Sequence, residues 1–141
     1  MSGISDLKTV ALDSNLFIYH FEGNEEFAPY TKKIFAKMAI GRLKAVTSIV
    51  SLLEILSLPA PPSAIARLEN AFMETPSLEI VDVDKEIVSY AVKVRRNYGF
   101  RLPDCIHLAT AKLHKVQVFI SNDSQLKRFE GVRVFMLKEL L

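Results

Sequence analysis

The chain of 141 residues contains no tryptophan, five glycines and a single cysteine, Cys105. One cysteine excludes a disulfide within the chain and any zinc site built from several thiolates. Cys105 lies between Asp104 and Ile106 in a predicted helix, and we interpret it as a packing residue.

Long hydrophobic runs are also missing. No run approaches the roughly 20 residues that span a bilayer, and residues 1–10 include charged side chains where a signal peptide needs an apolar stretch. We therefore expect a cytoplasmic protein that makes no membrane contact.

The chain has no strong excess of charge and no linker. Its net charge of +2 is too small to indicate a nucleic-acid-binding protein, so composition leaves the partner open. Half of the residues are hydrophobic, and no repeat or Gly/Ser-rich segment interrupts them. We expect one domain over residues 1–141.

Strand-like and helix-like segments alternate along the chain. Short apolar runs typical of strands lie at 10–12, 44–47, 78–83, 116–120 and 132–136. Segments with helical spacing or helix-stop signals lie at 15–21, 29–41, 49–58, 63–74, 85–98, from 103 and from 124. This order predicts an α/β fold with a mainly parallel sheet and helices on both faces, in which functional residues lie beyond the carboxyl ends of the strands.

Two aspartates follow predicted strands. Asp13 comes directly after the first strand, and Asp123 follows a later strand with only Ser121 and Asn122 between. A helix follows both aspartates, so N-capping explains either one alone. The other interpretation is that both belong to a site at the carboxyl edge of the sheet.

Glu54 lies in the strongly apolar segment 49–58. The hydrophobic residues cover nearly every side of a helix there, so we expect this helix to be buried. A carboxylate in such surroundings must be paired, protonated or bound to a cation. The alternative is a capping box of Ser51 and Glu54, which requires the helix to begin late.

Asp104 lies in the first turn of a helix opened by Pro103, where the helix dipole favours a negative charge. It shares a helix face with Leu108 and Ala111, and this face should point inward. Each of the four acids thus has a local explanation, but one divalent cation accounts for all of them. Mg²⁺ and Mn²⁺ prefer oxygen ligands, and converging carboxylates repel each other without a cation.

The pattern of these motifs resembles the PIN-domain nucleases. It consists of Asp13-Ser14-Asn15 after the first strand, Glu54 in an apolar helix, Pro103-Asp104 at a helix start, and Ser121-Asn122-Asp123 after a later strand. Nearly the whole chain is covered, and its size is similar to that of the VapC-like toxins of toxin-antitoxin pairs. The chain departs from the family after Asp123, because Leu126 stands where an aromatic residue is common and the aromatic comes at Phe129.

The resemblance implies a three-layer α/β/α sandwich that acts as a Mg²⁺- or Mn²⁺-dependent endoribonuclease. Asp13, Glu54, Asp104 and Asp123 are then the catalytic and metal-binding residues, with Asn15 and Ser121 as polar supports. RNA is the implied substrate, a protein antitoxin the implied partner and a homodimer the implied assembly. The apolar helix at 49–58 or the proline-rich segment after it is a candidate dimer interface.

Four further side chains lie close to the acids in sequence. Arg101, Lys127 and Arg128 are candidate contacts for RNA phosphates. His107, three residues after Asp104, is either a packed, hydrogen-bonded histidine or a partner or general acid of the site.

Other functions fit less of the pattern. A phosphatase that forms an aspartyl phosphate would need a second aspartate two residues after Asp13, where this chain has Asn15, and no glycine-rich nucleotide-binding loop is present. A non-toxin PIN-domain nuclease of RNA processing and a catalytically silent module that binds RNA or protein stay open. The RNA target is also open, since such recognition depends on surface shape and stacking.

Overall fold

The computed structural model describes residues 3–140, in which strands and helices alternate as the sequence predicts. The strands are β1 (Thr9–Leu12), β2 (Lys44–Ser48), β3 (Leu78–Val81), β4 (Val118–Ser121) and β5 (Arg133–Met136). The α-helices are α1 (Ser14–Glu22), α2 (Ala28–Ala39), α3 (Val50–Leu56), α4 (Pro62–Met73), α5 (Lys85–Tyr98) and α6 (Leu102–Leu113). Short 3-10 helices cover Ile4–Asp6, Ser124–Arg128 and Leu137–Leu140.

The five strands form one sheet in the order β3-β2-β1-β4-β5, and every pairing is parallel. After β1 the chain builds β2 and β3 on one side, and it then returns to add β4 and β5 on the other. The order therefore reverses between β1 and β4, where parallel sheets commonly hold their ligands. Leu12 of β1 is paired with Ile120 of β4. Asp13 and Ser121 come directly after this pair, so both lie where the strand order reverses.

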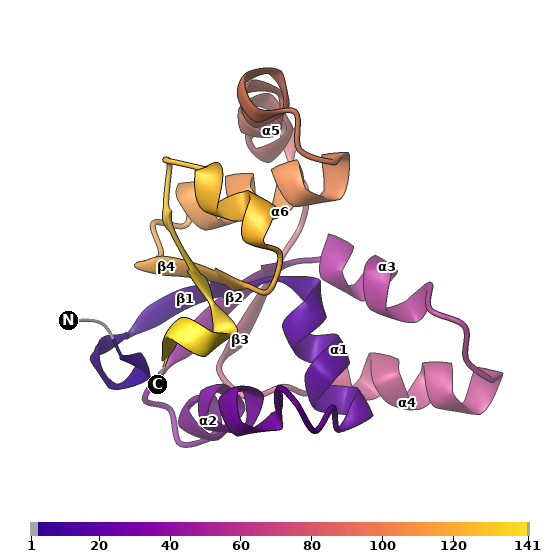
Figure 1. Cartoon of the computed structure of the whole chain (residues 1–141). Helices are drawn as coiled ribbons and strands as arrows, with labels where there is room; N and C mark the ends of the chain where they lie inside the picture. Colours follow the sequence, from indigo (N-terminus) through magenta and orange to yellow (C-terminus); the bar gives the residue numbers. More distant parts are fainter. Residues whose placement is uncertain (1–2, 141) are drawn as a thin grey trace.

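Helices cover both faces of the sheet (Figure 1). Val10 and Leu12 of β1 pack in a core with residues of α1, α2 and α4. The residue between them, Ala11, packs on the opposite face with residues of α5 and α6. This alternation along a single strand confirms the expected three-layer α/β/α fold.

The expectation that the helix around Glu54 is buried on all sides is wrong. In α3 the buried side chains are Ser51 and Ile55, whereas Leu53 is 66% exposed. The reason is the position of the helix, because α3 and α4 extend beyond the end of the sheet (Figure 1). The helix contacts α1, α4 and α6 and leaves Leu53 exposed.

The residues that begin and end α5, and the proline that opens α6, are those that the sequence predicts. Asp84 caps α5 by accepting a hydrogen bond from the Ile87 amide at 2.9 Å, and Gly99 ends the helix with a φ of 73°. Pro103 occupies the first turn of α6, and Cys105 is buried in the core as a packing residue. Among residues 3–140, no helix is both long and apolar enough to cross a membrane.

Candidate metal site

Asp13 lies directly beyond β1 and is 4% exposed. Its Oδ1 accepts a hydrogen bond from the Ser14 amide at 2.8 Å. Asp13 therefore caps α1, which was one of the two interpretations of the sequence. Its Oδ2 accepts a hydrogen bond from the Ser121 hydroxyl at 2.7 Å. Two donors from two elements therefore hold this buried carboxylate in one orientation.

Ser121 links the two aspartates that follow strands. Besides donating to Asp13, its buried hydroxyl accepts a hydrogen bond from the Asp123 amide at 3.0 Å. The Asp123 carboxylate caps the 3-10 helix that follows, accepting from the Gln125 amide at 3.0 Å. Asp123 thus lies at the same edge of the sheet, while its side chain is engaged in a cap.

Glu54 comes from the middle of α3 and is not part of a capping box. Ile49 is the N-cap residue and makes no side-chain cap bond, while the Ser51 hydroxyl bonds to that of Thr47 at 2.7 Å. The Glu54 carboxylate, 24% exposed, instead lies 2.6 Å from Nε2 of His107. Burial alone would raise the pKa of Glu54, but this hydrogen bond and the positive charges nearby lower it.

His107 is the functional candidate that sequence reasoning left undecided. It is fully buried on α6, and its Nε2 lies 3.9 Å from Asp13 Oδ1, between the two acids. Burial lowers the pKa of His107, yet the hydrogen bond to Glu54 and the charges of Asp13, Glu54 and Asp104 outweigh it, so the pKa is raised. The other ring nitrogen, Nδ1, is buried without a hydrogen-bond partner among the described residues.

Asp104 is buried on the first turn of α6, next to the same cluster. Burial and the negative charge of Asp13 raise its pKa, although the hydrogen bonds from Arg101 work in the other direction. Arg101 approaches it with Nε at 3.2 Å and a terminal nitrogen at 3.4 Å. The Arg101 side chain is 71% exposed and close enough to Glu54 and Asp123 to feel their charges.

The other residues predicted for the site are Asn15, Lys127 and Arg128. Asn15 follows Asp13, and its buried Oδ1 has no hydrogen-bond partner within residues 3–140. Lys127 forms an ion pair with Glu139. Arg128 donates to the Tyr98 carbonyl oxygen at 3.0 Å and stacks over Phe100.

The cluster fits a divalent cation. One carboxylate oxygen of Asp13, one of Glu54 and a ring nitrogen of His107 lie within 4.8 Å of one another. Carboxylate oxygens are the ligands that Mg²⁺ and Mn²⁺ prefer. Burial first, and the negative charge of Asp13 in addition, raise the pKa of Asp104, and a cation nearby would offset both effects.

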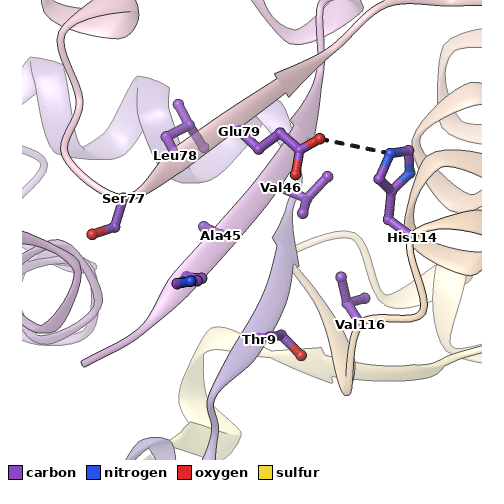
Figure 2. A pocket seen from close by; sticks show the side chains of 9 residues that line it. Thr9, Ala45, Val46, Ser77, Leu78, Glu79, His114 and Val116 are labelled. Carbon is purple, nitrogen blue, oxygen red and sulfur yellow. Dashed lines mark ion pairs between the residues drawn. The ribbon is translucent and has the colours of Figure 1, made fainter. Parts of the chain in front are cut away.

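A second recess lies at the opposite end of the sheet (Figure 2), where its lining includes Thr9 of β1, Ala45 of β2 and Leu78 of β3. One ion pair crosses it, between Glu79 and His114 at 3.9 Å. Both side chains are partly exposed, and Glu79 is the single acid among the residues that line the recess. The recess therefore lacks the converging carboxylates found beyond β1.

Comparisons with known proteins give two kinds of match. The family model of the PIN domain matches residues 10–132, a range that includes all four predicted acids. The fold is similar to the VapBC2 complex of Rickettsia felis bound to a DNA fragment from its promoter, with a TM-score of 0.73 and 15% identity over 91% of this chain and 98% of that one. The fold is also similar to DNA-bound VapBC of Salmonella typhimurium, with a TM-score of 0.72 and 16% identity over 93% of this chain and 99% of that one.

A toxin-antitoxin complex of Klebsiella pneumoniae gives a TM-score of 0.69 and 21% identity over 91% of this chain and 97% of that one. At these identities the likeness concerns the fold. The comparison with curated proteins gives no match.

Proposed function

The chain belongs to the PIN domain family, and from this premise we propose that it is a metal-dependent endoribonuclease, the toxin of a VapBC-type pair. PIN domains are generally nucleases. The observation that carries the proposal is the cluster at the end of β1, where buried Asp13 lies close to Glu54, with buried Asp104 near enough to Asp13 to feel its charge, at the switch point of a parallel sheet. In this proposal residues 1–141 act as one nuclease domain.

The proposed reaction is hydrolysis of RNA phosphodiester bonds, with products that carry a 5′-phosphate and a 3′-hydroxyl. When bound, Mg²⁺ or Mn²⁺ supplies an activated water and offsets charge on the leaving oxygen. Asp13 and Glu54 would hold the cation. Asp104 and Asp123 would complete the acidic set, in which a carboxylate orients the attacking water.

Neighbouring residues have supporting roles in the proposal. Ser121 keeps Asp13 oriented through its hydroxyl, and Asn15 adds an amide next to the same acid. Arg101 is exposed at the mouth of the cluster, where its guanidinium would contact an RNA phosphate. Lys127 and Arg128 would be further phosphate contacts, reached only if they leave their present partners.

The proposed partners are a protein antitoxin and a second copy of the chain, in the cytoplasm. The antitoxin is supported by the similar structures, which are toxin-antitoxin and VapBC complexes. For the homodimer, the candidate contact is at α3, where Leu53 and, just after the helix, Leu58 are exposed hydrophobic side chains.

The nuclease proposal is tested with labelled RNA in Mg²⁺ or Mn²⁺ and with EDTA as the metal-free control. We expect wild-type protein to cleave, and Asp13→Asn and Asp104→Asn to lose at least 100-fold in rate, since each removes charge from the acid cluster. Both variants keep the shape of the side chain, and circular dichroism checks that they fold. Cleavage that survives both substitutions would show that the site is wrongly assigned.

The toxin proposal is tested by expression of the chain alone in a bacterial host. Growth arrest that requires Asp13 is the expected result. An active nuclease that leaves growth unchanged would instead indicate RNA processing, and RNA binding without cleavage would indicate a catalytically silent module.

A further inference from the structure

We propose that His107 is a positioning residue, which holds Glu54 in place for the metal by donating a hydrogen bond from Nε2 and does not itself bind the metal. The inference rests on the proposed function in one respect, namely that Glu54 is a metal ligand. It assigns a role to a side chain outside the four acids. Three observations carry it.

The first observation is the short contact between the two side chains. Nε2 of His107 and Oε1 of Glu54 lie 2.6 Å apart. At this separation a lone pair on the ring nitrogen would repel the carboxylate oxygen, so a hydrogen atom must lie between them. A glutamate that serves as a metal ligand is deprotonated, so the hydrogen belongs to Nε2. A ring nitrogen that carries a hydrogen does not ligate a metal ion.

The second observation concerns the other ring nitrogen. If Nε2 bound the metal, the ring would carry its hydrogen on Nδ1, and ligating histidines almost always donate that hydrogen to an acceptor. Nδ1 of His107 is buried and has no acceptor among the residues that the structure describes. A ligating ring would strand a buried donor, whereas a neutral ring that donates from Nε2 leaves only an unused lone pair on Nδ1.

The third observation is how the acids are held. Asp13 is fixed by two hydrogen bonds and Asp104 by Arg101. Glu54 has a longer side chain and comes from α3, which extends beyond the sheet (Figure 1). His107 comes from α6 in the core, and its side chain is 1% exposed. The contact therefore ties the long Glu54 side chain to a buried side chain of the core, and this restriction lowers the entropy cost of metal binding.

The experiment measures Mn²⁺ affinity by titration calorimetry on wild-type protein and three variants. His107→Leu removes the donor, and we expect Mn²⁺ to bind 10- to 100-fold more weakly, the usual effect of losing a partner of a metal ligand. His107→Gln retains an N–H donor and should recover most of the affinity. The matched control is His114→Leu at the C-cap of α6. It breaks the pair with Glu79 of β3, at 3.9 Å (Figure 2), and should bind Mn²⁺ within twofold of wild type.

A spectroscopic measurement on wild type complements the titrations and does not depend on any variant folding. Electron spin echo spectra of the Mn²⁺-loaded protein should lack the strong ¹⁴N coupling of a directly bound imidazole. Such a coupling would overturn the proposal, and so would a folded His107→Leu variant that binds Mn²⁺ as tightly as wild type. Failure of the proposed function looks different, because then wild type binds no Mn²⁺ or Asp13→Asn binds it equally well.

Discussion

Replacing Ser121 with alanine should destabilise the metal-free protein by about 2 to 3 kcal/mol. The hydroxyl donates to the Asp13 carboxylate at 2.7 Å and accepts from the Asp123 amide at 3.0 Å. A hydrogen bond to a charged group contributes about 1.5–3 kcal/mol, and one between neutral groups about 1 kcal/mol. The sum is reduced because Asp13 keeps its bond from Ser14 and the Asp123 amide lies near solvent. For a chain of this size the loss lowers Tm by roughly 5 to 10 °C.

The assay is urea unfolding of EDTA-treated protein, followed by circular dichroism, where a lower midpoint with an unchanged slope reports lost stability. Ser124→Ala is the matched control, since Ser124 is exposed and should change stability by less than about 0.5 kcal/mol. Ser121→Thr keeps the hydroxyl and should retain most of the stability. If Ser121→Ala is as stable as the control, the hydroxyl does not anchor Asp13 and the reasoning is refuted.

Three further predictions concern His107, Gly131 and Leu53. Because the pKa of His107 is raised, its stabilising contribution is fully present below the ordinary value of about 6.5 and is lost as pH rises through the raised pKa. Urea midpoints of metal-free protein should therefore fall as pH rises above about 6.5, and this fall should be absent in His107→Leu. Gly131→Ala should cost about 1–3 kcal/mol in unfolding experiments, because a Cβ would lie 2.4 Å from a ring carbon of Phe129 and 2.9 Å from the Tyr90 hydroxyl. Leu53→Lys should turn the proposed dimer into a monomer in light scattering while changing thermal stability little; a dimer that persists would assign the interface elsewhere.

The order of strands and helices was predictable because each element shows its own period of apolar residues. The same alternation implies a parallel sheet, and parallel strands end at a common edge. Asp13 and Ser121 could therefore be assigned to one neighbourhood although 108 positions separate them. Their hydrogen bond is the direct consequence of the pairing between Leu12 and Ile120.

The environment of α3 was not predictable in the same way. Seven apolar residues around Glu54 indicate a buried helix when only composition and spacing are considered. Burial also depends on where the sheet ends, and α3 extends beyond that end, so Leu53 is exposed. A hydrophobic surface that needs a partner and one that faces the core have the same sequence pattern.

His107 shows the same limit for a functional residue. Its spacing from Asp104 places it on the inward side of α6 whether it packs in the core or serves the site. The difference lies in what faces it from another element, and here that is Glu54, 53 residues earlier in the chain. A pattern within one helix carries no information about this contact. Because His107, which spacing left undecided, is bonded to Glu54, the acid hardest to explain as a cap, the two residues together support a site at this position.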